Sequence, residues 1–146
     1  MRKADAAAAV FRDGFNCAQA VFSTLASDHG LDAATAAKIA TAFGGGMARS
    51  GETCGVVTGA FMALGLARGN GAPKDIAIKE KTYELAREYV KRFTERHRSL
   101  LCRELLGCDI STHEGHEKAK QQGLFGTVCA RLVRDSVEIV DELLRP

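Results

Sequence analysis

Apolar residues recur at the spacing of an α-helix along most of this chain, and this period constrains the fold more than any other feature. It is clearest from about Thr127 to Leu144, where apolar side chains return every three or four residues. No stretch alternates apolar and polar residues over the length of a strand. The sequence therefore predicts an all-α fold of about six or seven helices around one core.

Capping residues and glycines mark the ends of the expected helices. Asn16 and Asp32 are suited to cap the second and third helices, Ser111 or Thr112 a later short one, and Gly107 to end another. The expected helices run approximately over residues 2–11, 17–29, 33–43, 54–68, 75–98, 100–106, a short segment within 111–122, and 127–144.

Small residues form a stripe on the helix expected over residues 54–68. Gly55, Gly59 and Ala63 fall every four residues, so they share one side of that helix. A partner helix can pack closely against such a stripe. That partner belongs either to the same chain or to a second copy, so a homodimer is one of the two expectations.

Composition and charge exclude several classes of protein. The chain has 146 residues, which suits a single helical domain over residues 1–146, and 46% of them are hydrophobic and 26% charged. A net charge of +2 is too small to predict a polyanionic partner. Glu95 interrupts the basic stretch Lys91–Arg98, and Glu84 and Glu88 precede it, so nucleic-acid binding is not expected. No segment has the apolar length of a membrane span or the core of a signal peptide, so we expect a cytoplasmic protein.

Five cysteines carry the strongest indication of chemistry. In a cytosolic chain, several cysteines are more often metal ligands or redox groups than a disulfide framework. They are widely spaced, and no CxxC or CxxCH occurs, which excludes a zinc ribbon, a thioredoxin-like motif and covalently attached haem.

Four of these cysteines fall in the first turn of an expected helix: Cys17, Cys54, Cys102 and Cys129. The free N–H groups and the dipole of a helix N-terminus lower the pKa of a cysteine there. Four such termini directed at one place suit an iron–sulfur cluster, a soft metal such as zinc, or a pair of reactive dithiols. In the dithiol case we expect Cys54 to be the low-pKa nucleophile and Cys17, Cys102 or Cys129 to resolve it. The alternative for any single cysteine is simple burial as a small apolar side chain.

The order of these motifs resembles the C_GCAxxG_C_C family of redox-active proteins. The first cysteine lies in Asn16–Val21, the central motif is Cys54-Gly55-Val56-Val57-Thr58-Gly59, and the third and fourth cysteines are Cys102 and Cys129. The resemblance runs from about Ala6 to Leu144. Val56 replaces the alanine of the motif, and Cys108 lies outside the four-cysteine pattern.

The resemblance implies a redox function and a set of ligands. The family is similar to the cysteine-bearing part of split-Soret cytochromes, which combine such a domain with c-type haem and an iron–sulfur centre. On that analogy Cys17, Cys54, Cys102 and Cys129 are cluster ligands. Four thiolates suit a [2Fe–2S] cluster, with zinc as the alternative and no haem. Electron transfer with a protein redox partner is the leading expectation, followed by thiol–disulfide exchange and then a structural zinc domain.

The remaining candidate groups have simpler explanations. His113 and His116 are expected at a solvated helix start, since their spacing is not that of an HExxH metal site. Gly44-Gly45-Gly46 follows no strand and lacks the lysine of a phosphate-binding loop, so we expect it to allow close approach of Cys54 to other helices. Arg98 and Arg103 are expected to form a basic rim near Cys102 that attracts an acidic redox partner.

Overall fold

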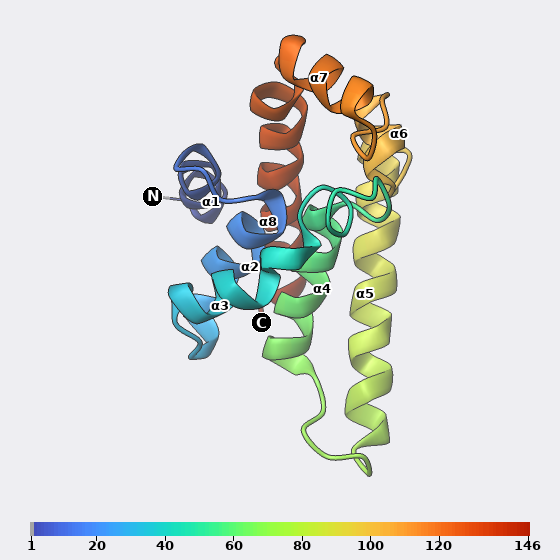
Figure 1. The fold of residues 1–146 in the computed structure, drawn as a ribbon. Coiled ribbons are helices and arrows are strands. Elements are labelled where there is room, and N and C mark those ends of the chain that lie inside the picture. The colour runs from blue at the N-terminus through green and yellow to red at the C-terminus, as the bar shows by residue number, and fades with distance from the viewer. Residues whose placement is uncertain (1) are drawn as a thin grey trace.

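The fold was analysed in a computed structural model that describes residues 2–146. The predicted all-α class is confirmed: the described residues contain no strand beyond an isolated bridge between Thr53 and Leu101 (Figure 1). There are eight α-helices over these residues, one for each range expected from the sequence and one more than the upper end of the expected number. They are α1 (Lys3–Arg12), α2 (Cys17–Ala26), α3 (Ala33–Ala40), α4 (Gly55–Arg68), α5 (Ile76–His97), α6 (Cys102–Leu106), α7 (His113–Gln121) and α8 (Ala130–Leu144).

The predicted caps begin the helices as expected. The side chain of Asn16 accepts a hydrogen bond from the N–H of Gln19, and Gln19 returns one to the N–H of Asn16, which completes a capping box on α2. The side chain of Asp32 accepts a hydrogen bond from the N–H of Thr35 and so caps α3, and that of Thr112 accepts from the N–H of Gly115 and caps α7. The start of α2, and so the position of Cys17, is therefore fixed by local sequence.

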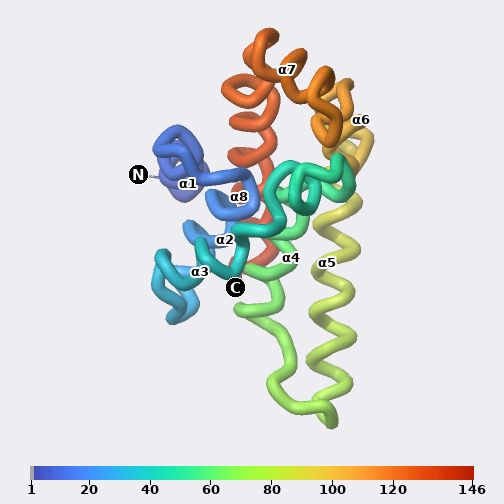
Figure 2. Tube along the Cα trace, viewed as in Figure 1, coloured from blue at the N-terminus to red at the C-terminus, as the bar shows by residue number. Residues whose placement is uncertain are grey.

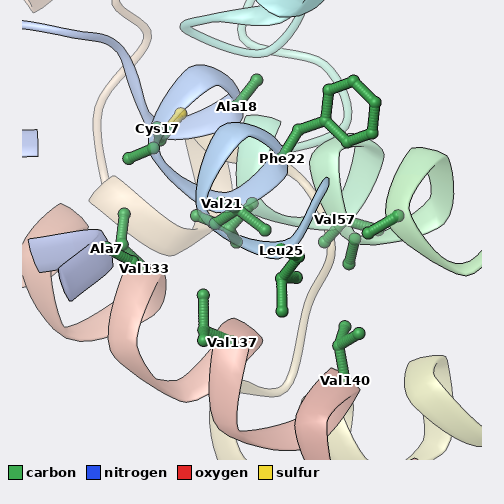
Figure 3. Packing of buried hydrophobic residues seen from close by; sticks show 14 of the residues in the cluster. Ala7, Cys17, Ala18, Val21, Phe22, Leu25, Val57, Val133, Val137 and Val140 are labelled. Carbon is green, nitrogen blue, oxygen red and sulfur yellow. The ribbon is translucent and has the colours of Figure 1, made fainter. Parts of the chain in front are cut away.

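Helix α2 is the centre of the core. It packs against α1, α3, α4 and α8 (Figure 2). Figure 3 shows Val21 and Leu25 of α2 lying between α4 and α8, with Val137 of α8 close to them. These side chains are buried, and the central helix places its first residue, Cys17, at one end of the core.

The stripe of small residues packs inside the chain. A Cβ atom added at Gly59 would lie 2.9 Å from the backbone oxygen of Ala18, so this face of α4 lies directly against α2. Of the two expected partners for the stripe, the structure shows the one within the chain.

A buried polar network fixes α4 against α5 and α8. The hydroxyl of Ser136 donates to the backbone oxygen of Val56 at 2.8 Å, and Tyr89 and Ser136 share a hydrogen bond of 2.7 Å. Both side chains are fully buried. Because Val56 is two residues after Cys54, the network also fixes the start of α4.

The segment between α3 and α4, residues 41–54, curls beside α6 (Figure 1). Its last residues pair with the segment before α6: the N–H of Cys54 donates to Leu100, and the N–H of Cys102 donates to Glu52. No helix within residues 2–146 has the length and apolar character needed to cross a membrane.

Candidate functional site

The four cysteines singled out in the sequence line a single cavity of about 590 Å³. Cys17 is the first residue of α2, Cys54 precedes α4, Cys102 is the first residue of α6, and Cys129 ends the π-helical segment before α8. All are free thiols; the first three are buried and Cys129 is half-buried. The fold thus brings together side chains from four separate segments.

Cys17 and Cys54 form a hydrogen-bonded pair of sulfurs. The hydrogen bond from Cys54 is the largest cause that lowers the pKa of Cys17, to about 7. The same hydrogen bond, together with burial, raises the pKa of Cys54. The pair therefore favours a thiolate on Cys17 over a thiolate on Cys54.

Backbone N–H groups complete the environment of the Cys17 sulfur. Hydrogen bonds from Gly45, Ala18 and Gly55 also lower its pKa against the opposing effect of burial. They come from the glycine-rich segment, from α2 and from the first residue of α4. Three converging N–H donors are a common way for proteins to stabilise a buried anion.

Gly55 is required by the close packing of this sulfur. A Cβ atom at position 55 would lie 2.5 Å from the sulfur of Cys17 and 3.0 Å from the N–H nitrogen of Ala18. Any side chain there would separate α4 from α2. The glycine of the Cys54-Gly55 motif therefore permits the Cys17–Cys54 contact.

The electrostatics of the other cysteines differ from the sequence prediction. Burial raises the pKa of Cys102 to about 11 and that of Cys129 to about 12, and the nearby Cys17 sulfur adds to both shifts. At Cys54 the hydrogen bond with Cys17 and burial raise the pKa by more than the N–H of Val56, in the first turn of α4, lowers it. Desolvation outweighs the helix terminus at Cys102, whose helix has five residues. These directions favour Cys17 over Cys54 as the more acidic thiol, and the role of Cys54 as nucleophile stays a prediction.

Cys129 does not lie in the first turn of a helix, contrary to the sequence prediction. The helical stretch begins at Leu124, so Cys129 lies in its second turn and not at an N-terminus. Residues Phe125–Cys129 form a π-helix. A π-helix is wider than an α-helix and often marks a functional site, and here it ends at the cysteine that faces the cavity.

A left-handed turn forms one wall of the cavity. Five consecutive residues from Gly45 to Arg49 have φ between 52° and 72°, and three of them are not glycine. An L-residue in this conformation costs about 1–2 kcal/mol. Hydrogen bonds from the N–H of Gly51 to the backbone oxygen of Gly45 and from the N–H of Glu52 to that of Gly46 close the turn.

The glycines of this turn contact two of the cysteines. The N–H of Gly45 reaches Cys17. Gly46 packs on Cys102, where a Cβ atom added to the glycine would lie 2.8 Å from the Cβ of the cysteine. The expectation that the glycines serve Cys54 is thus replaced by contacts with Cys17 and Cys102.

Two further side chains at the cavity were not expected from the sequence. Arg49 lies in the left-handed turn, and His116 lies on α7 with its ring centroid 5.5 Å from that of Phe125. His113 is exposed, as expected of a helix start, but His116 is not purely solvated. No local pattern marks either residue, because only the packing of the loop and α7 over the cysteines places them there.

The basic rim takes a different form from the one expected. Arg103 donates to the backbone oxygen of Gly51 and pairs with Glu52 at 3.0 Å, so it holds the bridge beside Cys102. Arg98 ends α5 with φ of 69°. Cys108 lies outside the cavity lining and packs beside Cys102 and Cys129 in a small second cluster of apolar residues.

The cavity was compared with what a [2Fe–2S] cluster requires. Four cysteine thiols are the ligand set of such a cluster, and all four line one largely apolar cavity together with N–H donors. Within the described part of the chain, no three His, Cys, Asp or Glu side chains are arranged to hold one metal ion. By donor chemistry, the four thiols match the ligand set of such a cluster.

Comparison with known proteins places the chain in one family. Residues 15–143 match the family described as "Putative redox-active protein (C_GCAxxG_C_C)". Because the match covers most of the chain, the protein belongs to this family of redox-active proteins. No curated protein and no solved structure matches it significantly.

Proposed function

We propose that this protein transfers electrons through a [2Fe–2S] centre held by Cys17, Cys54, Cys102 and Cys129. The observation that carries the proposal is that these four thiols, from four separate segments, line a single cavity. When bound, such a centre supplies one-electron transfer.

The residues around the sulfurs have definable roles in this function. The N–H groups of Gly45, Ala18 and Gly55 stabilise negative charge on the Cys17 sulfur. Hydrogen bonds to sulfur and exclusion of water are two of the factors that set the potential of a cluster. Apolar residues such as Leu106 and Leu132 are buried and make the wall of the cavity less polar.

Metal and sulfide analysis tests the proposal directly. Protein purified without oxygen is expected to contain about two iron and two acid-labile sulfide per chain, with visible absorption. Cys54→Ser should lose both, whereas Cys108→Ser, outside the cavity lining, should keep them. Stoichiometric zinc without sulfide, or no iron after anaerobic reconstitution, would contradict the proposal.

The hydrogen-bonded pair supports a second candidate function, thiol–disulfide exchange. The Cys17 thiolate attacks a substrate disulfide, forms a mixed disulfide and releases one thiolate. Cys54 then loses its proton and attacks the Cys17 sulfur, which forms the Cys17–Cys54 disulfide and releases the second thiolate. The protein is oxidised by two electrons and the substrate is reduced by two.

A redox titration of metal-free protein tests this second candidate. In a thiol–disulfide buffer, peptide mapping should find a disulfide joining Cys17 to Cys54 in the oxidised form. Cys102→Ser should leave that disulfide intact. A different pairing, or no disulfide in a strongly oxidising buffer, would exclude this function.

A further inference from the structure

The cavity is larger than its cysteines require. A two-iron, two-sulfide core has four atoms, and at roughly 30 Å³ each, the volume of a water molecule in the liquid, it would fill about a fifth of the space. The cavity volume of about 590 Å³ lies within the range of sites for small organic ligands. There is therefore room for a small molecule beside the sulfurs.

Apolar side chains form most of the remaining wall. Phe11 comes from α1, Leu105 and Leu106 from α6, Phe125 from the π-helix and Leu132 from α8. Such a lining favours a ligand with an apolar body, since burying apolar surface stabilises by about 25 cal/mol per Å².

Apart from the cysteine sulfurs, the charged side chain at the cavity is a cation. Arg49 is among the described residues that line it, whereas no Asp or Glu is. The ion pairs among residues 2–146 leave the exposed guanidinium of Arg49 free. Glu52, three residues away, is paired with Arg103 instead. The Cys17 thiolate is covered by its own N–H donors.

The fold also fixes the position of Arg49. The backbone of this residue has φ of 60° at the end of the left-handed turn, and its N–H donates to Gly44. A strained backbone held at a site is often part of its function. The turn places a cation at the cavity wall, directly after the glycines that contact Cys17 and Cys102.

We propose that the cavity binds a small organic anion with an apolar body, and that Arg49 holds its anionic group. The inference rests on the proposed function only in that this molecule would be the electron donor or acceptor of the cysteine site. The redox partner would then be a small molecule, whereas the sequence analysis expects a protein.

Two probes that share one aromatic body test the proposal. They are 8-anilinonaphthalene-1-sulfonate, an anion, and N-phenyl-1-naphthylamine, which lacks the sulfonate. Equilibrium dialysis against anaerobically purified protein should show tighter binding of the anion. Added salt should weaken the binding of the anion and not that of the neutral probe.

Variants of Arg49 locate the anionic group. Arg49→Gln should weaken binding of the anion about fivefold, as expected for a charged hydrogen bond near the surface, and leave the neutral probe unchanged. Arg49→Lys should restore much of the loss. Arg87→Gln, which removes an exposed cation of α5 away from the cavity, should change neither probe.

A variant that fills the cavity locates the apolar body. Leu105→Trp should weaken both probes, because it occupies space inside the cavity. Equal binding of the two probes, an equal effect of the Arg49 and Arg87 variants, or no effect of Leu105→Trp would each overturn the proposal.

Iron and sulfide analysis of the same preparations keeps the two proposals separate. If the protein holds the cluster but binds the anion without dependence on Arg49, this inference fails and the proposed function stands. If binding of the anion depends on Arg49 but no cluster forms, the anion site stands and the proposed electron transfer through a [2Fe–2S] centre fails.

Discussion

At the scale of single residues, the site depends on how closely two sulfurs and one glycine approach each other. A neighbouring thiol and three N–H groups lower the pKa of Cys17 to about 7. Gly55 permits this because any side chain would overlap the Cys17 sulfur.

Substitution of Gly55 tests that packing. Gly55→Ala should destabilise the protein by about 1–3 kcal/mol, the usual cost of overpacking a core. On the same helix, Gly65 has nothing within 4 Å of an added Cβ, so Gly65→Ala should stabilise by about 0.5–1 kcal/mol. Urea unfolding of both variants measures the difference, and a similar effect of the two would show that the contact is absent.

The pKa of Cys17 predicts a pH-dependent reactivity. In reduced, metal-free protein, alkylation of Cys17 by iodoacetamide should increase as the pH rises through about 7, because the thiolate is the reactive form. Cys54→Ala removes the largest cause of the lowered pKa, so the midpoint should move to higher pH. An unchanged midpoint would mean that Cys54 does not donate to Cys17. Peptide mapping by mass spectrometry identifies the alkylated cysteine.

At the scale of elements, caps and turns position the reactive residues. The capping box fixes the start of α2, and Asn16 also donates from its side chain to the backbone oxygen of Thr41 at 3.0 Å. That second bond connects the helix start to the segment that leads into the glycine-rich turn.

Two caps of similar strength allow a matched comparison. Asn16→Ala and Asp32→Ala should each destabilise by about 1 kcal/mol. Only Asn16→Ala should also raise the pKa of Cys17, because Asn16 caps α2 and Cys17 is the first residue of that helix. The alkylation profile of each variant measures this, and a shift in the Asp32 variant would point to a general loosening of the fold.

In the left-handed turn, substitution of an alanine by glycine should stabilise the protein, whereas the same substitution in a regular helix should destabilise it. Ala48 has φ of 52° and is exposed, so Ala48→Gly relieves strain and should stabilise by up to about 1 kcal/mol. Ala77 is exposed in a regular helix, so Ala77→Gly should destabilise by about 0.5–1 kcal/mol. Thermal unfolding of both variants gives the two signs, and destabilisation by Ala48→Gly would argue against the left-handed backbone.

At the scale of the whole molecule, the network of Tyr89, Ser136 and Val56 joins three helices far apart in sequence. Ser136→Ala should destabilise by about 1–3 kcal/mol, because it removes a donor from a buried carbonyl and a partner from a buried phenol. With Tyr89→Phe and the double variant, a double-mutant cycle in urea should show coupling. Additive effects would mean that the two hydroxyls act separately.

Much of this protein was predictable from local patterns. The helical period gave the all-α class, and the caps at Asn16, Asp32 and Thr112 gave three helix starts. The spacing of the cysteine motifs indicated the family that the match over residues 15–143 shows. The helical period and the caps depend on residues within one or two helical turns of each other, and the motifs are read in their order along the chain, so the sequence alone determines these features.

Other features depend on contacts between distant segments, and only the tertiary structure decided them. The pKa of Cys17 is lowered because Cys54 and the N–H groups of Gly45 and Gly55 meet there, and burial overrides the helix terminus at Cys102. The π-helix moves Cys129 away from an N-terminus, and the left-handed turn brings Arg49 to the cavity. The physical reason is that desolvation and hydrogen bonding at a buried sulfur are set by the atoms packed around it, whatever their distance along the chain.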